Sequence, residues 1–425
     1  MIDVKLLREE PEKVKDGIAK KNKDPKLVDR FLELDNEWRK LTKDADELRA
    51  EQKKVAAARD IEGGKQLKEK LRAVEEKMGH LDTEREVVWK SIPNLPFPEV
   101  IVGKDESENQ VIRKWHEPAK FDFEPKDHLD LGEALDIIDV KRASEISSAR
   151  FAYLKGDLAM LEFALVTHVL KTLQDESVLR PIAEAAKKGY SAKPFVPVIP
   201  PQMIRPEVLE RMGRLEPKED RYHLAEDDLY LIGSAEHTLG PLHMDEIIPE
   251  EKLPIRYVGF STSFRREAGT YGKDMKGILR VHQFDKLEME SFCAPEDSIV
   301  EQDFFVGLQE YLVQSLELPY QVVSVCTGDM GGPDARQIDI DTWMPGQGRY
   351  RETHTSDLMT DYQSRRLNAR MRRADGTVEL VHMNDATAFA IGRILIAIME
   401  NYQTAEGKIR VPKVLVPYMG KEVIG

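Results

Sequence analysis

Apolar residues near the start of the chain recur at alternating steps of four and three positions. The first run comprises Leu27, Phe31, Leu34, Trp38, Leu41, Ala45 and Leu48, and the second comprises Leu67, Leu71, Val74, Met78 and Leu81. This spacing places one apolar stripe along each of two helices, as in a coiled coil. Gly63 and Gly64 lie between the runs and mark the expected turn. Because each stripe needs a partner to be buried, the pattern predicts an antiparallel coiled-coil hairpin.

The pattern changes after the stretch SIPNLPFPEV, residues 91–100, which contains three prolines. Proline cannot continue a helix, so the stretch ends the hairpin and marks a domain boundary, which we place between residues 103 and 104. Beyond it, short strand-like and helix-like runs follow one another without βαβ regularity. They predict an α+β fold with a mainly antiparallel sheet.

Individual elements of residues 104–425 follow from the same pattern. Amphipathic runs predict helices over residues 156–176 and 384–403. Alternating runs predict strands over residues 193–201, 228–239, 320–329, 336–344 and 364–373. The sequence has no G-x-G-x-x-G motif and no P-loop, so a nucleotide would have to be bound in another way.

Two more alternating runs, residues 255–267 and 277–292, predict a hairpin around the polar stretch GTYGKDMKG. One face of its second strand would carry Arg280, His282, Phe284, Lys286 and Glu288. Charges of both signs beside an aromatic ring suit a flat anionic ligand. A solvated hairpin with cross-strand ion pairs would show the same residues, so both interpretations stay open.

The chain has 425 residues and a formal net charge of −14, with 41% hydrophobic and 33% charged residues. These values fit a large two-domain protein and exclude a chain that coats nucleic acid indiscriminately. Cys293 and Cys326 stand far apart, which indicates neither a disulfide framework nor a thiolate zinc site. No apolar run reaches membrane-spanning length, and the charged N-terminus is unlike a signal peptide. A cytoplasmic protein without a membrane partner is expected.

Charged residues outside the hairpin could also take part in chemistry. Arg393 lies in an otherwise apolar run and needs an anionic partner, either a ligand or a buried structural carboxylate. Glu352 and Thr355 offer two oxygen ligands for a hard cation, although an acid on a surface loop would look the same. Glu236, in the stretch GSAEHT, is a further candidate.

The heptad hairpin, the stretches FRREAG and GILRVHQFDKLE, and the stretch FAIGRILIAIMENYQ followed by IRVPKVLVPYMG together resemble the seryl-tRNA synthetases, class II aminoacyl-tRNA synthetases. The resemblance covers the whole chain. It implies a helical domain with a tRNA-binding arm over residues 1–103. It further implies a class II catalytic domain over residues 104–425, with an antiparallel sheet flanked by helices. A homodimer, formed through the helix of residues 156–176 and the strand ending at Pro201, is also implied.

The resemblance implies that ATP and Mg²⁺ are needed to activate serine. Arg265 and Glu267 would hold the α-phosphate and adenine, Phe284 would stack under the adenine, and Arg393 would meet the γ-phosphate. The implied ATP-binding set is Arg265, Glu267, Phe284, Glu352, Thr355 and Arg393, of which Arg265, Glu267 and Arg393 are the catalytic candidates and Glu352 and Thr355 the metal ligands. Attack of a carboxylate on the α-phosphate needs in-line positioning and neutralised charge, which such residues can supply.

The resemblance also implies a pocket for serine. Ser234 and Glu236 match the family's T-x-E motif, with serine for threonine, and would receive the ammonium group. Glu288 and Thr387 match the residues that face the substrate hydroxyl, and the implied serine-binding set is Ser234, Glu236, Arg265, Glu288 and Thr387. Around alanine, the carboxylate and the hydroxyl would both be left unpaired, so hydrogen bonding selects serine.

The sequence departs from the family pattern at two places. It has TSDL where the family usually has SCSN, and DAT where the family has NGS. Asp357, Leu358 and Asp385 therefore occupy positions usually filled by serine and asparagine. These changes either surround an unchanged pocket or shift its specificity.

The distal part of the heptad hairpin, residues 49–77, carries nine basic and six acidic residues, an excess of three on an acidic protein. Fixed positive charge attracts phosphates, and A-form RNA is read by shape and backbone. The resemblance implies tRNA(Ser) as the partner, with tRNA(Sec) as a second candidate. A solvated coiled coil without a ligand is the alternative.

Two other functions fit parts of the sequence. A synthetase-like ligase that loads an amino acid onto a carrier protein would not need the heptad hairpin. A non-catalytic scaffold would not need the combination of Arg265, Glu267, Glu288, Glu352 and Arg393.

Overall fold

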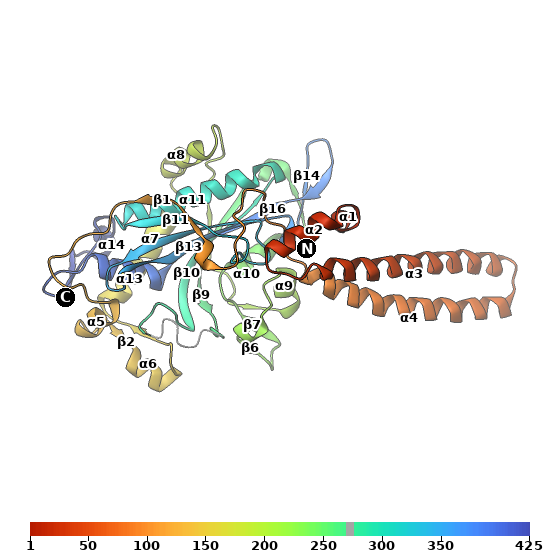
Figure 1. The fold of residues 1–425 in the computed structure, drawn as a ribbon, viewed down its shortest axis with the longest axis horizontal. Helices are drawn as coiled ribbons and strands as arrows, with labels where there is room; N and C mark the ends of the chain where they lie inside the picture. Colours follow the sequence, from red (N-terminus) through yellow and green to blue (C-terminus); the bar gives the residue numbers. More distant parts are fainter. Residues whose placement is uncertain (269–275) are drawn as a thin grey trace.

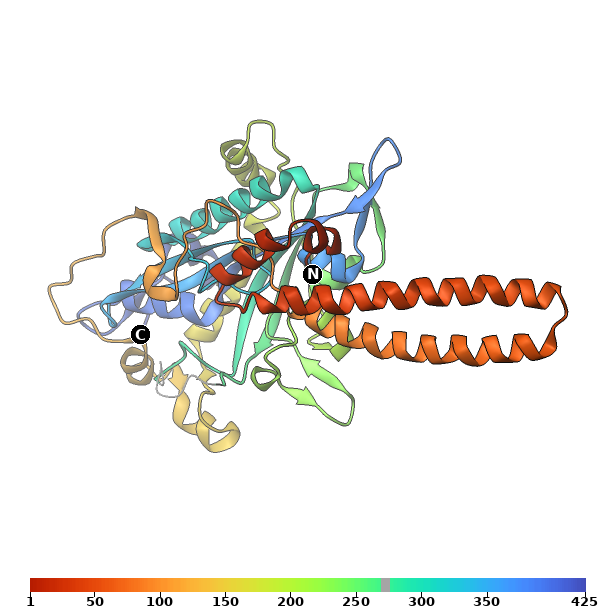
Figure 2. The same cartoon turned by 45° about the vertical axis from the view of Figure 1, so that its right-hand side comes forward.

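The computed structural model describes residues 1–268 and 276–425, so most of the predicted polar stretch GTYGKDMKG lies outside the described residues. Residues 1–91 form the helices α1 (Val4–Glu9), α2 (Pro11–Lys20), α3 (Lys26–Ala57) and α4 (Ile61–Ser91). Helices α3 and α4 run side by side and project far from the rest of the molecule (Figures 1 and 2). The predicted antiparallel hairpin is confirmed.

The turn of this hairpin lies at residues 58–60, so the expectation that Gly63 and Gly64 mark it is wrong. Both glycines belong to the first turn of α4. Asp60 caps that helix, because its carboxylate accepts a hydrogen bond from the Gly63 amide at 3.0 Å. Arg59 adopts the left-handed conformation, with φ of 56°. Helix capping, more than glycine flexibility, therefore sets the position of the turn.

The base of the hairpin is held by apolar packing and by one buried carboxylate. Phe31 of α3 packs in a cluster with Leu7 of α1. Asp35, 1% exposed, accepts hydrogen bonds from Arg8 at 2.8 Å and from Arg85 at 2.9 Å. Burial alone would raise the pKa of Asp35, but the hydrogen bonds from Arg8 and Arg85 outweigh it and hold that pKa below its ordinary value. Asp35 thus ties α1, α3 and α4 together.

The helical domain is joined to the rest of the chain by two polar side chains at the base of the hairpin. Lys21 donates hydrogen bonds to the carbonyl oxygen atoms of Gly331 at 2.6 Å and Asp334 at 2.8 Å. Asn94 donates to the carbonyl oxygen atoms of Pro333 at 2.9 Å and Met359 at 2.8 Å. Because backbone carbonyl groups of residues 331–359 accept these hydrogen bonds from both sides of the hairpin base, the direction of the hairpin is fixed.

Residues 104–425 are built on an eight-stranded sheet with the order β1-β11-β12-β13-β16-β10-β9-β4. Its strands are β1 (Gln110–Trp115), β4 (Val196–Val198), β9 (Ile255–Phe264), β10 (Gln283–Cys293), β11 (Tyr320–Ser324), β12 (Arg336–Met344), β13 (Arg349–Thr360) and β16 (His382–Ala390). Within this sheet β4 and β9 are parallel and the other neighbours are antiparallel. The predicted α+β fold is confirmed.

Three longer helices flank the sheet (Figure 1). Helix α11 (Ser298–Ser315) packs on β13 and β16. Helices α7 (Asp157–Thr172) and α13 (Ile391–Asn401) pack against each other, and all three contribute to one apolar core. Among the described residues, no helix has both the length and the apolar character that a membrane crossing needs.

Shorter elements surround this core. The helices are α5 (His128–Ala134), α6 (Val140–Ser147), α8 (Glu176–Ala186), α9 (Pro206–Arg211), α10 (Glu236–Leu239), α12 (Tyr362–Leu367) and α14 (Val416–Met419). The strands are β2 (Ile138–Asp139), β3 (Tyr153–Leu154), β5 (Met203–Ile204), β6 (His223–Leu224), β7 (Leu229–Leu231), β8 (Ile247–Pro249), β14 (Arg370–Arg372), β15 (Val378–Leu380), β17 (Ile409–Arg410) and β18 (Val423–Ile424).

Tertiary pairing overrides the local pattern in four segments. The helix predicted over residues 384–403 begins only at Ile391, because residues 382–390 form β16. That strand pairs with β10 on one side and β13 on the other and is buried on both faces, so it lacks the alternation typical of a half-exposed strand. The second strand of the predicted hairpin begins at Gln283, not at residue 277.

The other two corrections concern strands that are shorter than predicted. The strand predicted over residues 228–239 ends at Leu231, and Glu236 begins helix α10. The strand predicted over residues 364–373 divides into the end of α12 and the short strand β14. In that segment Asn368 takes the left-handed conformation that ends a helix, with φ of 57°.

We expect Asp35→Asn to loosen the base of the hairpin, because Arg8 and Arg85 lose the carboxylate that they share. The free energy of opening of the α3 and α4 amides around this site should fall by about 1–3 kcal/mol. Hydrogen exchange followed by mass spectrometry measures it. Glu33→Gln is the control, since Glu33 pairs with Arg30 at the surface and should contribute less than about 0.5 kcal/mol. Equal effects of the two substitutions would contradict the role of Asp35.

Candidate active site

A cavity of about 100 Å³ lies over the central strands of the large sheet. Seven of the ten residues proposed from the sequence line it, namely Arg265, Glu267, Phe284, Glu352, Thr355, Thr387 and Arg393. They come from the end of β9, from β10, from β13, and from the junction of β16 with α13. The fold therefore brings together residues that are more than a hundred positions apart in the sequence.

The strands β9 and β10 form one wall of the cavity. Arg265 donates from its amide to the His282 carbonyl at 3.0 Å, and the His282 Nδ1 donates to the Arg265 carbonyl at 2.9 Å. The Arg265 guanidinium donates to the Gly233 carbonyl at 3.1 Å and lies 5.3 Å from the centre of the Phe284 ring. Glu267 pairs with Arg280 at 2.7 Å. A flat anionic ligand would meet a fixed guanidinium and an aromatic ring here.

Arg393 and Glu352 form the opposite wall. The Arg393 guanidinium donates to a Glu352 carboxylate oxygen at 3.0 Å and to the Glu352 carbonyl at 2.8 Å. The Arg393 side chain is 25% exposed and that of Glu352 is 52% exposed. This exposure excludes the alternative of a buried structural ion pair for Arg393, and it leaves both groups open to a ligand.

A wider hollow of about 650 Å³ adjoins the cavity and shares Arg280, Glu352 and Arg393 with it. Asp339 and Asp341 of β12 also line this hollow, and Asp341 is paired in the ladder with Glu352. Burial raises the pKa of Asp339 and of Asp341, and the nearby Glu352 raises both further. Acids and arginines therefore line the same hollow, and Arg393 pairs with Glu352 within it.

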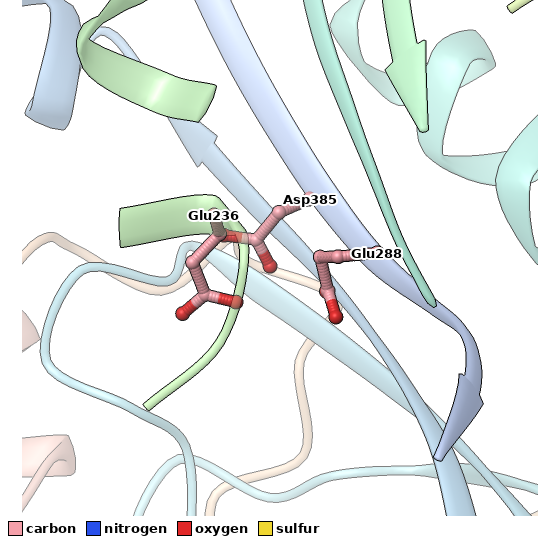
Figure 3. A group of neighbouring side chains, drawn as sticks. All are labelled: Glu236, Glu288 and Asp385. Carbon is pink, nitrogen blue, oxygen red and sulfur yellow. The ribbon is translucent and has the colours of Figure 1, made fainter. Parts of the chain in front are cut away.

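The three remaining predicted residues form a buried cluster, here called the inner pocket, next to Lys286 and Thr387 of the cavity lining. Ser234, Glu236 and Glu288 are buried, and the Ser234 hydroxyl donates to Glu288 at 3.3 Å. Glu236 and Glu288, with Asp385, place carboxylate oxygen atoms within 4.8 Å of one another. Figure 3 shows these carboxylates side by side. Thr387, 3% exposed, is the partner of Glu288 in the ladder and connects the pocket to the cavity.

Two cations, Lys286 and Arg214, lie beside the carboxylates of the inner pocket. Lys286 donates to Ser234 at 3.0 Å, lies 3.9 Å from Glu236 and is in closer contact with Glu288. Arg214 lies 3.4 Å from Glu236. Burial alone would raise the pKa of Glu236, but Arg214 and then Lys286 outweigh it and hold that pKa well below its usual range. Burial raises the pKa of Glu288 to about 7 in spite of Lys286.

The inner pocket therefore contains carboxyl groups in two different states. Glu236 is ionised and able to bind a cation, whereas Glu288 is partly protonated near neutral pH. One Glu288 oxygen, Oε1, and one Asp385 oxygen, Oδ1, are buried and have no hydrogen-bond partner among the residues that the structure describes. Such atoms need a partner, so the pocket is suited to a small ligand that carries both an ammonium group and a hydrogen-bonding group.

The departures from the family pattern lie at and beside this pocket. Asp357 on β13 is directly opposite Asp385 on β16, and Asp385 is opposite Glu290 on β10. All three side chains are buried, and burial is the largest cause that raises each pKa well above its usual value. Leu358 is fully buried opposite Asn384. Asp385 is thus part of the pocket itself, whereas Leu358 belongs to the packing of β13.

Sequence reasoning missed two cations and two acids of the site. The alternating pattern of β10 places Lys286 on one face with Phe284 and Glu288, but it indicates no role for Lys286. Asp339 and Asp341 alternate along β12 and could have been found from that pattern. Arg214 follows helix α9 in a segment without a recognisable motif, and only the tertiary structure places it beside Glu236.

Comparisons with known proteins define first the class and then the family. Residues 219–402 match the family model described as tRNA synthetase class II core domain (G, H, P, S and T). An antiparallel sheet of this order, with arginines and acids over its central strands, accordingly identifies a class II aminoacyl-tRNA synthetase. The predicted boundary between residues 103 and 104 stays a prediction.

Residues 1–96 match the family model described as Seryl-tRNA synthetase N-terminal domain. The serine–tRNA ligase of Dictyoglomus turgidum is 42% identical, over 99% of this chain and 98% of that protein, and that of Thermotoga maritima is 41% identical, over 100% of both. The crystal structure of seryl-tRNA synthetase from Pyrococcus horikoshii complexed with ATP has a TM-score of 0.85 and 39% identity, covering 100% of this chain and 99% of that one. The chain belongs to the seryl-tRNA synthetase family.

Proposed function

We propose that this protein is a serine–tRNA ligase, which activates L-serine with ATP and transfers the seryl group to the 3′ end of tRNA(Ser). The observation that carries the proposal is the continuity of two sites. Lys286 and Thr387 line the outer cavity, and the same residues border the inner pocket of Glu236 and Glu288. A nucleotide and an amino acid bound there would therefore meet, as adenylate formation requires.

ATP fits the cavity and the adjoining hollow together, in the following arrangement. The adenine stacks on Phe284 and is held with Glu267, while Arg265 faces the α-phosphate and Arg393 the γ-phosphate. An oxygen of the serine carboxylate attacks the α-phosphorus, the bond to the bridging oxygen breaks, and pyrophosphate leaves. The two guanidinium groups offset the negative charge and hold the reacting atoms in line.

Mg²⁺ fits the part of the hollow where Glu352, Asp339 and Asp341 lie. Glu352 and Thr355 are the proposed ligands, and Asp341 and Asp339 stand opposite them in the ladder. These groups offer the hard oxygen atoms that Mg²⁺ prefers. When bound, the ion supplies positive charge to the phosphates. Gln309 steadies this region, since it donates to the backbone carbonyl of Thr355 at 2.7 Å.

Serine fits the inner pocket. Glu236 and Ser234 receive its ammonium group, and Glu288 and Thr387 bind its hydroxyl. Alanine has the same shape without the hydroxyl, so it would leave the unpartnered Glu288 Oε1 buried and unsatisfied. The unmatched polar atom, more than the size of the pocket, rejects alanine.

We further propose that the α3–α4 hairpin binds tRNA(Ser), with tRNA(Sec) as a second candidate, while the terminal ribose enters the active site and attacks the adenylate. A helix of 32 residues such as α3 reaches about 45 Å from the body, far enough to contact an outer region of a tRNA. The hairpin is also a part that a ligase for a carrier protein would not need. A cytoplasmic location belongs to the same proposal.

A homodimer is the proposed assembly. The segments that family resemblance places at its interface expose large apolar side chains: Met160 and Phe163 on α7 are 53% and 60% exposed, and Val196 and Ile199 are 54% and 85% exposed. Val196 also lies on β4, the edge strand of the large sheet. A partner subunit would bury these side chains and cover that edge.

Glu352→Ala should lower serine-dependent exchange of pyrophosphate into ATP by about 100-fold, because it removes a metal ligand and the partner of Arg393. The measurement is the exchange rate across a series of Mg²⁺ concentrations. Glu207→Ala on helix α9 is the control, since Glu207 is 63% exposed outside the site. An undiminished rate in Glu352→Ala would refute the assignment.

Binding of serine at pH 7 should release about half a proton per site, because the ammonium group lowers the pKa of Glu288 from about 7 and favours its ionised form. Calorimetry in buffers of different ionisation enthalpy measures the release. It should fall toward zero at about pH 8.5, where Glu288 is already ionised. Release that is absent at pH 7, or unchanged at the higher pH, would contradict a neutral Glu288 beside the ligand.

Replacement of residues 43–77 by a short glycine linker should leave serine-dependent exchange nearly intact and abolish charging of tRNA(Ser). This deletion keeps Asp35, Arg8 and Arg85, so the base of the hairpin stays folded. A full-length variant with Lys53, Lys54, Lys65 and Lys68 changed to Gln tests the charge alone, and its charging should weaken and depend less steeply on salt concentration, because fewer phosphates are neutralised. Equal charging by the truncated and full-length proteins would overturn this function of the hairpin.

A further inference from the structure

Arg214 enters the inner pocket from the segment after helix α9 and contacts three carboxylates. Its Nη2 atom lies 3.1 Å from Asp385 Oδ2 and 3.7 Å from Asp357 Oδ2, and its Nε atom lies 3.4 Å from Glu236 Oε1. The Arg214 side chain is 16% exposed. A largely buried guanidinium with this set of partners has a fixed position, because any movement would leave the cation and the acids buried without their partners.

The acids beside Arg214 would repel one another without it. Asp357, Asp385 and Glu290 lie in one lateral row across β13, β16 and β10. Like charges directly opposite in a sheet are destabilising, and burial increases the cost. The Arg214 charge lowers the pKa of all three acids against the larger effect of burial. Two members of this row, Asp357 and Asp385, are the departures from the family pattern.

Glu236 is held on both of its oxygen atoms. Arg214 approaches Oε1 at 3.4 Å and Lys286 approaches Oε2 at 3.9 Å. Lys286 also contacts Glu288 and Ser234, so its charge is shared within the pocket. Arg214 reaches Glu236 from the side of the acidic row. The orientation of the Glu236 carboxylate therefore depends on this second cation.

We propose that Arg214 is a positioning residue for serine: it holds Glu236 oriented toward the ammonium group and pairs with Asp385, so that the ligand meets one ionised carboxylate and not an unbalanced cluster. The inference rests on the proposed function and deepens it. It also accounts for Asp357 and Asp385 as members of one charge-balanced unit with Arg214, built around a pocket for serine.

The test is serine-dependent pyrophosphate exchange by the full chain. Arg214→Gln should raise the KM for serine by about tenfold or more, because Glu236 loses the cation beside its Oε1 atom, and should change the KM for ATP by less than about twofold. Arg214→Lys keeps the charge but loses the planar guanidinium, so its KM for serine should lie between that of the wild type and that of Arg214→Gln. Arg205→Gln is the control: Arg205 precedes helix α9 and is 75% exposed, so this variant should behave as the wild type.

A double-mutant cycle tests the pairing with Asp385. In the Asp385→Asn protein, Arg214→Gln should raise the serine KM by a smaller factor than it does in the wild type, since the Asp385 carboxylate is no longer there to be left without its cation. If Arg214→Gln alone does not fold, Arg214→Lys takes its place in both arms of the cycle. Independent effects that multiply would overturn the pairing.

Further outcomes separate this inference from the proposed function. Wild-type protein that exchanges no pyrophosphate with serine would overturn the function. Wild-type activity together with an unchanged serine KM in Arg214→Gln would leave the function standing and overturn the role of Arg214. A scaffold role alone would lower kcat or raise both KM values, and that result would also count against positioning.

Discussion

Carboxylates buried side by side need fixed cations, and the placement of Arg214 and Lys286 among them is the interaction on which the inner pocket depends. Glu236 stays ionised because both cations flank it, while Glu288 contacts Lys286 alone of the two and burial raises its pKa to about 7. Without the cations, the acids would take up protons and lose their power to bind an ammonium group. Recognition of the ammonium group therefore depends on the cations that balance the buried acids.

The antiparallel sheet makes this balance possible. Neighbouring strands β9, β10, β16 and β13 present their side chains in lateral rows, so residues distant in the sequence stand about one strand spacing apart. Gln309 of α11 donates to the carbonyl groups of Thr355 and Thr387 at 2.7 Å and 2.9 Å and ties two of these strands together. A reaction that depends on positioning, with little covalent work for the protein, suits such a rigid platform.

The hairpin serves a different physical need. Its outer half is solvated and carries the basic excess, whereas its base is locked by Asp35 and fixed to the body by Lys21 and Asn94. A rigid helical hairpin with a fixed base can hold its basic residues at a set distance from the active site. The outer half of the hairpin and the active site can then contact one long ligand, although they do not contact each other.

Local pattern determined much of this protein from the sequence alone. The heptad spacing gave the hairpin, because each apolar stripe needs a partner, and alternation gave β9, β11 and β12. The motif resemblance selected seven residues that line one cavity, among them Arg265, Glu352 and Arg393.

Only the tertiary structure decided the rest, because those features depend on partners distant in the chain. Residues 382–390 are a strand since β10 and β13 pair with them on both sides, although their pattern continues that of a helix. The turn at Asp60 follows from capping geometry. Arg214 shows no local signal, and its role arises from Glu236, Asp357 and Asp385, which reach it from three other segments of the chain. Electrostatic balance in a buried site is a property of the assembled fold.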